Sequence, residues 1–210
     1  MERQLAAVGL AKDPRVAFFP AFKGPQADPF SCVGAYGCFL SHKQIISEAA
    51  DANESVLILE DDCDFLPAIQ SYEAPDFDVF YGGYIALEPL NLENSDIIGS
   101  HFMGFSAHGA KVAASYLSGY LSPDFQLGPF RPGQKPCAPS ERPGIDGAYV
   151  WMRRAHPELK STFAQVGVQR PSRTDIGFQR WFDKLPIARV AAGFARRFKS
   201  SSSKRGHQFG

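Results

Sequence analysis

The segment that most constrains the fold is an apolar run that ends in a cluster of acids. Residues 55–59 read Ser-Val-Leu-Ile-Leu, and Glu60, Asp61, Asp62 and Asp64 follow directly. A continuous apolar run of this kind is typical of a strand that is buried on both faces of a parallel sheet. Open α/β sheets bind their ligands at the carboxyl ends of such strands. The sequence therefore predicts an α/β fold with a ligand site directly after this run.

The acidic cluster predicts a site for a divalent cation. Carboxylates this close together repel one another unless solvent or a cation relieves their charge. Their oxygens are hard ligands, which suit Mg²⁺ or Mn²⁺ better than zinc. We expect Glu60, Asp61 and Asp62 to hold such an ion against a diphosphate, with Asp64 as an accessory ligand. The ion would neutralise charge on a leaving nucleoside diphosphate. A polar turn without a ligand is the alternative.

The rest of the chain alternates strand and helix patterns, as α/β domains do. The patterns predict strands at residues 15–19, 78–81 and 102–105, and helices at residues 1–10, from Gly37 for about four turns, and at 107–120. Residues 146–153 and 158–164 are also expected to be ordered. The proline-rich stretch 123–143 is expected to be an irregular loop that flanks a site.

Charge is segregated along the chain although its net charge is zero. Residues 44–110 contain thirteen acidic residues and no lysine or arginine, whereas residues 170–205 contain ten basic residues and two acidic ones. A basic amphipathic helix is predicted at residues 186–199, before a serine-rich tail that we expect to be disordered. Residues 186–205 could contact an anionic membrane surface. A solvated terminal helix is the alternative.

Composition limits the location and the partners of the protein. The four cysteines show neither CxxC pairing nor matching histidine spacing, which predicts free thiols in a reducing compartment. No apolar run approaches the length of a membrane span, and the N-terminus lacks the layout of a signal peptide. We therefore expect a cytoplasmic protein, with peripheral contact at the inner face of the membrane. The confinement of basic residues to one end argues against nucleic-acid binding.

Two motifs at a characteristic spacing resemble glycosyltransferase family 25. They are Gly-Cys-Phe-Leu-Ser-His at residues 37–42 and Val-Leu-Ile-Leu-Glu-Asp-Asp at residues 56–62. Weaker similarities follow in the family's order: residues 99–102 with 108–111, residues 145–146, and Gln169 with Thr-Asp-Ile at 174–176, where threonine replaces the family's serine. The resemblance covers most of residues 1–177. The first two motifs are fairly specific to the family. Each later match is weak by itself and supports the resemblance only because the matches occur in the family's order.

The resemblance implies a GT-A-like α/β domain at residues 1–185 with a mostly parallel central sheet, followed by the basic helix and tail at 186–210. It implies transfer of galactose or a related hexose from a UDP-sugar to a glycan or lipid-linked glycan, as in lipopolysaccharide or surface-polysaccharide synthesis. The implied cofactor is Mn²⁺ or Mg²⁺, held by Glu60, Asp61 and Asp62.

Further site residues follow from position and chemistry. Ser41 and His42 are candidates for donor contacts, although a serine or histidine near a helix start is also a common structural residue. An inverting transferase needs a carboxylate that accepts the proton of the acceptor hydroxyl. Asp146 is the preferred base and Asp175 is the second candidate. Each could instead be a loop aspartate or a helix cap.

The sequence departs from the family at its N-terminus, where the usual first apolar strand is missing. We therefore expect an N-terminally truncated sheet with an exposed edge, and weak or absent transfer activity for this 210-residue form. A degenerate, non-catalytic nucleotide-sugar-binding remnant is one alternative. A haloacid-dehalogenase-like phosphohydrolase is another, because residues 62–64 read Asp-Cys-Asp after an apolar strand. Phe65 and Leu66 replace the usual glycine or threonine of that motif.

Overall fold

The computed structural model describes residues 1–130 and 141–170. Four α-helices and one 3-10 helix form in these residues: α1 Glu2–Ala7, α2 Val33–Ala52, η1 Pro67–Ser71, α3 Ala107–Tyr120 and α4 Ile145–Ala155. The strands are β1 Val56–Leu59, β2 Cys63–Phe65, β3 Val79–Tyr81, β4 Ile85–Ala86, β5 Ile97–Ile98, β6 Phe102–Phe105, β7 Ser161–Phe163 and β8 Gly167–Gln169.

The central sheet is mixed and has the strand order β1-β6-β3-β7. β6 pairs antiparallel with both β1 and β3, and β3 pairs parallel with β7. The expectation of a mostly parallel sheet is therefore wrong, although the α/β class is confirmed. Parallel neighbours require a long crossover, usually a helix. Only the short β4–β5 pair separates β3 from β6, so β6 returns antiparallel.

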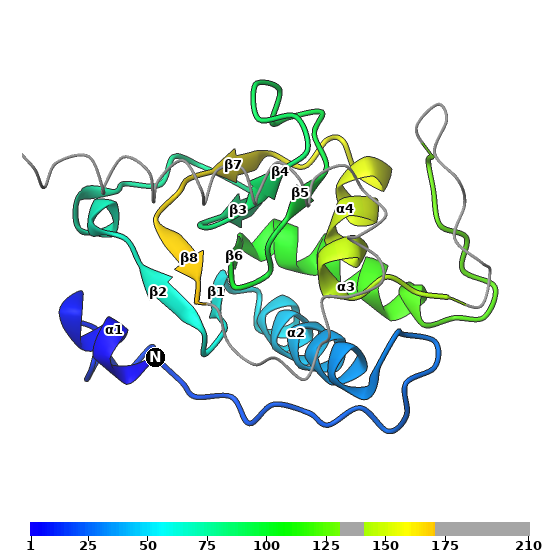
Figure 1. The fold of residues 1–210 in the computed structure, drawn as a ribbon, viewed down its shortest axis with the longest axis horizontal. Helices are drawn as coiled ribbons and strands as arrows, with labels where there is room; N and C mark the ends of the chain where they lie inside the picture. Colours follow the sequence, from blue (N-terminus) through cyan, green and yellow to red (C-terminus); the bar gives the residue numbers. More distant parts are fainter. Residues whose placement is uncertain (131–140, 171–210) are drawn as a thin grey trace, which may run out of the picture. The chain divides into compact units, whose positions relative to one another are not determined.

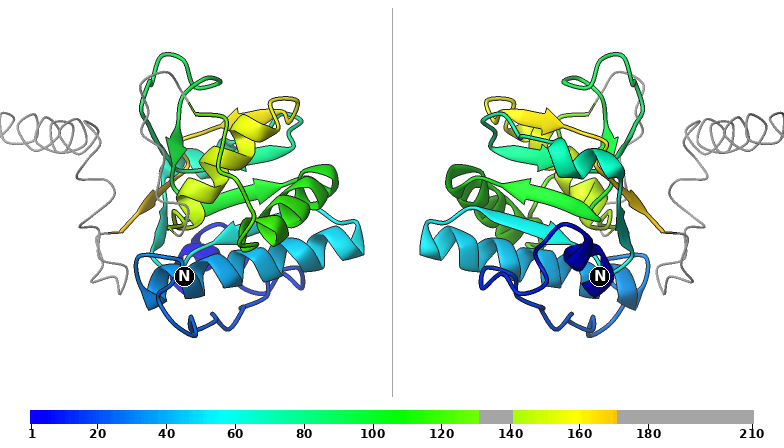
Figure 2. Two further views of the ribbon diagram at one scale, coloured as in Figure 1. Left: turned by 90° about the vertical axis from the view of Figure 1, so that its right-hand side faces the viewer. Right: turned by 90° about the vertical axis from the view of Figure 1, so that its left-hand side faces the viewer.

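The central sheet separates two apolar clusters. Figures 1 and 2 show α2, α3 and α4 on one face of the sheet, and η1 with the β2–β8 pair on the other. Val79 and Tyr81 of β3 point into the helix-facing cluster, whereas Phe80 between them joins Phe102 in the opposite cluster. This alternation is the period of two that a strand imposes. The middle of the sheet is thus buried on both faces.

β1 differs from this pattern because it is an edge strand. Among the described residues it pairs with β6 alone. Ile58 is buried against the helices, but Leu57 on the other face is 52% exposed. The expectation that this run is buried on both faces is therefore wrong for Leu57. The run is apolar on both sides, yet only one of its faces has a full layer of protein over it.

Helix α2 carries the first resemblance motif and begins against an extended segment of chain. The Cys32 side chain accepts a hydrogen bond from the Ala35 N–H and so caps the helix. A Cβ atom added at Gly37 would lie 2.4 Å from the carbonyl oxygen of Phe22. Only glycine therefore allows this close approach. The helix ends at Asn53, which adopts the left-handed conformation with φ 56°.

Arg142 is buried and forms hydrogen bonds with the backbone at the C-terminal end of α3. Its guanidinium donates to the carbonyl oxygens of Tyr120, Ser122 and Phe125 at 3.0 to 3.1 Å. We expect Arg142→Met to lower the free energy of unfolding by about 3 kcal/mol, because three carbonyl groups lose a charged donor. Urea denaturation measures this. Arg15→Met, which removes an exposed ion pair with Asp13, is the control and should change nothing. Equal effects of the two variants would contradict the prediction.

Several sequence expectations can be compared with the described residues. The helices expected at 1–10 and 107–120 are confirmed as α1 and α3, and the strand expected at 102–105 as β6. The strand expected at 15–19 is wrong, because this segment pairs with no strand in the described part of the chain and leaves Phe18 66% exposed. The helix and tail at 186–210, and the domain boundary at residue 185, lie outside the described residues.

Candidate functional site

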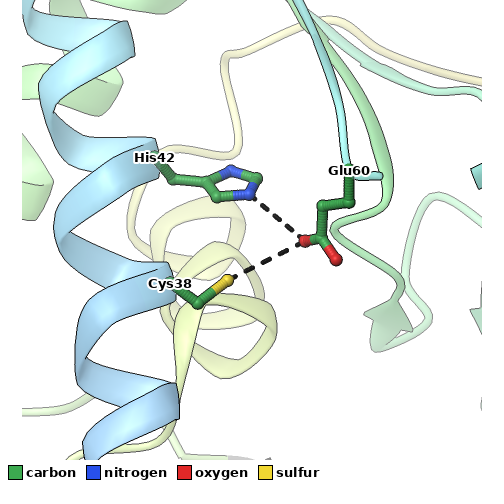
Figure 3. Close-up of side chains that lie close together, drawn as sticks. All are labelled: Cys38, His42 and Glu60. Atoms are coloured by element: carbon green, nitrogen blue, oxygen red, sulfur yellow. Dashed lines mark hydrogen bonds and ion pairs between the residues drawn. The ribbon is translucent and has the colours of Figure 1, made fainter. Parts of the chain in front are cut away.

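The centre of the candidate site is the Glu60 carboxylate, directly after β1. The Glu60 N–H donates to the carbonyl oxygen of His101 at 3.0 Å, which continues the β1–β6 pairing by one residue. Its Oε1 atom accepts hydrogen bonds from Ser100 Oγ at 2.6 Å and His42 Nε2 at 3.2 Å, and a longer one from Cys38 Sγ at 3.9 Å. Figure 3 shows Cys38 and His42 reaching Glu60 from α2. Glu60 therefore links the helix to the sheet.

The hydrogen bonds keep Glu60 ionised. Burial by itself would raise the pKa of Glu60, but the bonds from His42 and Ser100 outweigh it and lower the pKa. His42 Nδ1 lies 2.9 Å from the Tyr149 hydroxyl. Burial raises the pKa of Tyr149 well above its usual value, so the phenol keeps its proton and can donate to Nδ1. His42 Nε2 faces the Glu60 carboxylate at 3.2 Å and can donate to it.

Asp146 lies in the first turn of α4 and contributes a second carboxylate. Its Oδ1 accepts a hydrogen bond from the Gly99 N–H at 3.1 Å. Burial raises the pKa of Asp146 to about 6, with a further contribution from the negative charge of Glu60, whereas hydrogen bonds from Ser100 and Gly99 act in the opposite direction. A carboxylate with such a pKa can exchange a proton near neutral pH.

The raised pKa of Asp146 gives a pH-dependent stability. The folded protein holds the Asp146 proton up to about pH 6, whereas the unfolded chain releases it near 3.8. Stability therefore falls as the pH rises through this interval, by on the order of 3 kcal/mol. We expect Asp146→Asn to be more stable than wild type at pH 7.5 but not at pH 4. Urea denaturation of metal-free protein at both values measures this. A constant difference between the two proteins would contradict it.

The acids that follow Glu60 point to different surroundings. Asp61 is exposed, whereas Asp62 is buried and its Oδ2 accepts a hydrogen bond from Gln169 Nε2 at 3.1 Å. Asp64 pairs with Arg170 and also accepts a hydrogen bond from Gln4 at 2.8 Å. The structure thus does not bring all four carboxylates to one point. The Asp61 carboxylate is exposed to solvent, whereas the Asp64 carboxylate forms an ion pair with Arg170.

The remaining predicted residues have other surroundings. The Ser41 hydroxyl donates to the Gly37 carbonyl at 2.8 Å and accepts from the Phe22 N–H at 2.9 Å. These bonds favour the structural interpretation of Ser41. Asp175 lies outside the described residues.

Several residues of the site were not singled out from the sequence. Cys38 is not among the predicted site residues, yet its spacing of four residues from His42 places both side chains on one side of α2, and this spacing can be seen in the sequence. Ser100 lies in the segment 99–102 that resembles the family but was not predicted as a site residue, and Tyr149 gave no signal in the sequence. The contacts of both residues at the site are long-range.

His101 was also missed as a member of the site. It is 6% exposed, and neither ring nitrogen makes a hydrogen bond of good geometry among the described residues. Burial lowers the pKa of His101, whereas the charges of Glu60 and Asp62 act to raise it. A Cβ atom at Gly83 would lie 2.4 Å from its Nε2, so the glycine makes room for the ring. A buried neutral imidazole thus lies beside the two carboxylates.

The arrangement can hold a metal ion through Cys38, His42 and Glu60, whose ligand atoms all lie within 4.8 Å of one another.

Comparisons with protein-family models, with curated proteins and with solved structures find no match. Among the described helices, none is both long and apolar enough to cross a membrane. The three described cysteines, Cys32, Cys38 and Cys63, are free thiols.

Proposed function

We propose that this chain is a glycosyltransferase domain that moves a hexose from a nucleotide diphosphate donor to a glycan acceptor. The observation that carries the proposal is that residues from several separate segments with family resemblance lie together at the end of β1. His42, Glu60, Ser100 and Asp146 come from four separate segments that resemble family 25, and hydrogen bonds join them in one group or place them beside it. Gln169, from a fifth segment, bonds to the adjacent Asp62. Segments that merely resemble a family by chance have no reason to meet at one strand end.

The donor diphosphate would lie at Asp61 and Asp62, with Mn²⁺ or Mg²⁺ between protein and phosphate. Such ions commonly take one or two protein carboxylates and fill their remaining positions with waters and substrate phosphates. The exposed Asp61 and the adjacent Asp62 fit that requirement, while Glu60 is turned toward α2. Glu60 would then fix the position of the acidic segment. When bound, the ion would neutralise charge on the leaving diphosphate.

Asp146 is the proposed base. Its pKa of about 6 leaves it ionised at neutral pH while keeping it more basic than an ordinary aspartate. It lies beside Glu60, and the exposure of the residue as a whole is intermediate. Its hydrogen bond from Gly99 fixes the orientation of the carboxylate.

The proposed setting is the biosynthesis of lipopolysaccharide or another surface glycan at the cytoplasmic face of the membrane. A GT-A-like arrangement, a UDP-hexose donor and a lipid-linked acceptor belong to this proposal. Contact of residues 186–205 with the membrane is part of it and lies outside the described residues.

The test is calorimetry of uridine diphosphate binding in the presence of Mn²⁺. Wild type should bind the nucleotide only with the ion, and the double variant Asp61→Asn/Asp62→Asn should bind about 100-fold more weakly. Asp51→Asn, an exposed aspartate on α2, is the matched control. Indistinguishable binding by wild type and the double variant would overturn the proposal.

A non-catalytic nucleotide-sugar-binding protein is the second candidate. The position of β1 at an edge of the sheet favours it, because among the described residues a ligand at the end of β1 would have a neighbouring strand on one side only. Metal-dependent nucleotide binding without any sugar transfer, measured with a panel of UDP-sugars, would select this candidate over the enzyme.

A further inference from the structure

A second cation site, separate from the diphosphate ion, can be argued from the side chains that surround Glu60 on the helix side. Cys38 and His42 lie one turn apart on α2, and Glu60 approaches them from the end of β1 (Figure 3). The three side chains offer a thiol, an imidazole and a carboxylate. Their ligand atoms are Sγ, Nε2 and Oε1, within 4.8 Å of one another.

The distances among these atoms are close to those of a tetrahedral zinc site. Ligands at about 2.0 Å for nitrogen and oxygen and about 2.3 Å for sulfur lie about 3.3 to 3.5 Å apart around Zn²⁺. The observed separations from Glu60 Oε1 are 3.2 Å to His42 Nε2 and 3.9 Å to Cys38 Sγ. The third separation, between Cys38 Sγ and His42 Nε2, is at most 4.8 Å. Side-chain shifts of up to about 1.3 Å would therefore bring all three atoms to the spacing of a zinc site.

The charge of the group also favours a cation. Within residues 1–130 and 141–170, the donors that reach Glu60 are Cys38, His42 and Ser100, and none of these carries a fixed positive charge. Asp146 adds a second carboxylate close by. Zn²⁺ bound to one thiolate and one carboxylate forms a group without net charge, which a buried site tolerates. Cys38 would release its proton on binding.

The surroundings hold the ligands in place. The Tyr149 hydroxyl lies 2.9 Å from His42 Nδ1, the ring nitrogen that is not a ligand. With Nε2 bound to a metal, the neutral imidazole carries its proton on Nδ1, and the Tyr149 hydroxyl can rotate to accept a hydrogen bond from it. Metal-bound histidines almost always have such a partner on the other nitrogen. Ser100 orients the Glu60 carboxylate in the same way.

We propose that Cys38, His42 and Glu60 bind a zinc ion that ties α2 to the end of β1. Thiolate and imidazole ligands select zinc over the hard ions Mg²⁺ and Mn²⁺, so this site and the exposed Asp61 would take different metals. Three protein ligands leave the fourth position to water. The site does not depend on sugar transfer and would exist in a non-catalytic protein as well.

The experiment is a cobalt titration of the full chain after treatment with a chelator, in the absence of nucleotide. Wild type should bind one Co²⁺ with the charge-transfer absorption of a cobalt–thiolate bond and intense visible bands of tetrahedral cobalt. Added Zn²⁺ should abolish both signals. Cys38→Ser should lose the thiolate absorption and bind Zn²⁺ at least about 100-fold more weakly.

Controls separate this site from its alternatives. Cys32→Ser, which replaces another partly buried thiol near the start of α2, should keep the thiolate absorption. Glu60→Gln keeps a side chain of similar shape and should bind cobalt more weakly, with a folded circular dichroism spectrum as the check. Absence of thiolate absorption in wild type, or its persistence in Cys38→Ser, would overturn the zinc site. Neither result bears on the Mn²⁺-dependent binding of uridine diphosphate.

Discussion

Replacing Asp146 with Asn is expected to lower the rate of sugar transfer by about 1,000-fold, because the variant cannot accept the proton of the acceptor hydroxyl. Binding of uridine diphosphate should be unchanged, since Asp61 and Asp62 remain in place. Transfer is measured with a UDP-hexose and a glycan acceptor under the ionic conditions of the binding assay. Asp51→Asn should transfer at the wild-type rate.

This variant also separates catalysis from structure. The raised pKa of Asp146 means that its charge destabilises the folded protein at neutral pH, so Asp146→Asn should be more stable while it is less active. A residue with a purely structural role would lose stability and activity together. Wild-type transfer by Asp146→Asn would remove Asp146 from the mechanism and leave the other roles in the site untouched.

Replacing Phe39 with Ala is expected to lower the free energy of unfolding by about 4 kcal/mol. Phe39 is fully buried between α2 and α3, where its ring lies 5.0 Å from that of Phe30 and 5.4 Å from that of Tyr120. The cavity left by the ring cannot close without moving one of the helices. The midpoint of thermal unfolding should fall by about 10 °C.

The matched control is Phe18→Ala, because the Phe18 side chain is 66% exposed. The same deletion of a ring should then have little effect on the thermal midpoint. Comparable shifts for Phe39→Ala and Phe18→Ala would contradict the packing described for α2 and α3.

Helices and strands with a strong local pattern of apolar residues could be predicted from the sequence, whereas the pairing of strands in the sheets could not. α3 was expected at residues 107–120 and has those bounds, because Ser106 caps it and its small and apolar residues repeat at helical spacing. The short strands β2 and β8 were missed. They have three residues each and depend on pairing with each other across about a hundred residues.

The site could be predicted in part for the same reason. Glu60 at the end of an apolar strand and His42 in its motif were expected from local sequence. The position of Asp146 in α4 next to Gly99 depends on folding, and so does the bond from Ser100 to Glu60. The ion pair between Asp64 and Arg170 also depends on folding, because nothing in the local sequence indicates it.

The position of β1 at the edge of the sheet affects how binding and unfolding experiments on this protein are carried out. Natural proteins protect such edges with charged residues or proline, but Val56–Leu59 contains neither. Among the described residues β1 has a partner on one side only, so two molecules in solution can associate through its other side. Binding and unfolding experiments should be repeated at several protein concentrations, with light scattering as the check, so that self-association is not read as a change at Glu60.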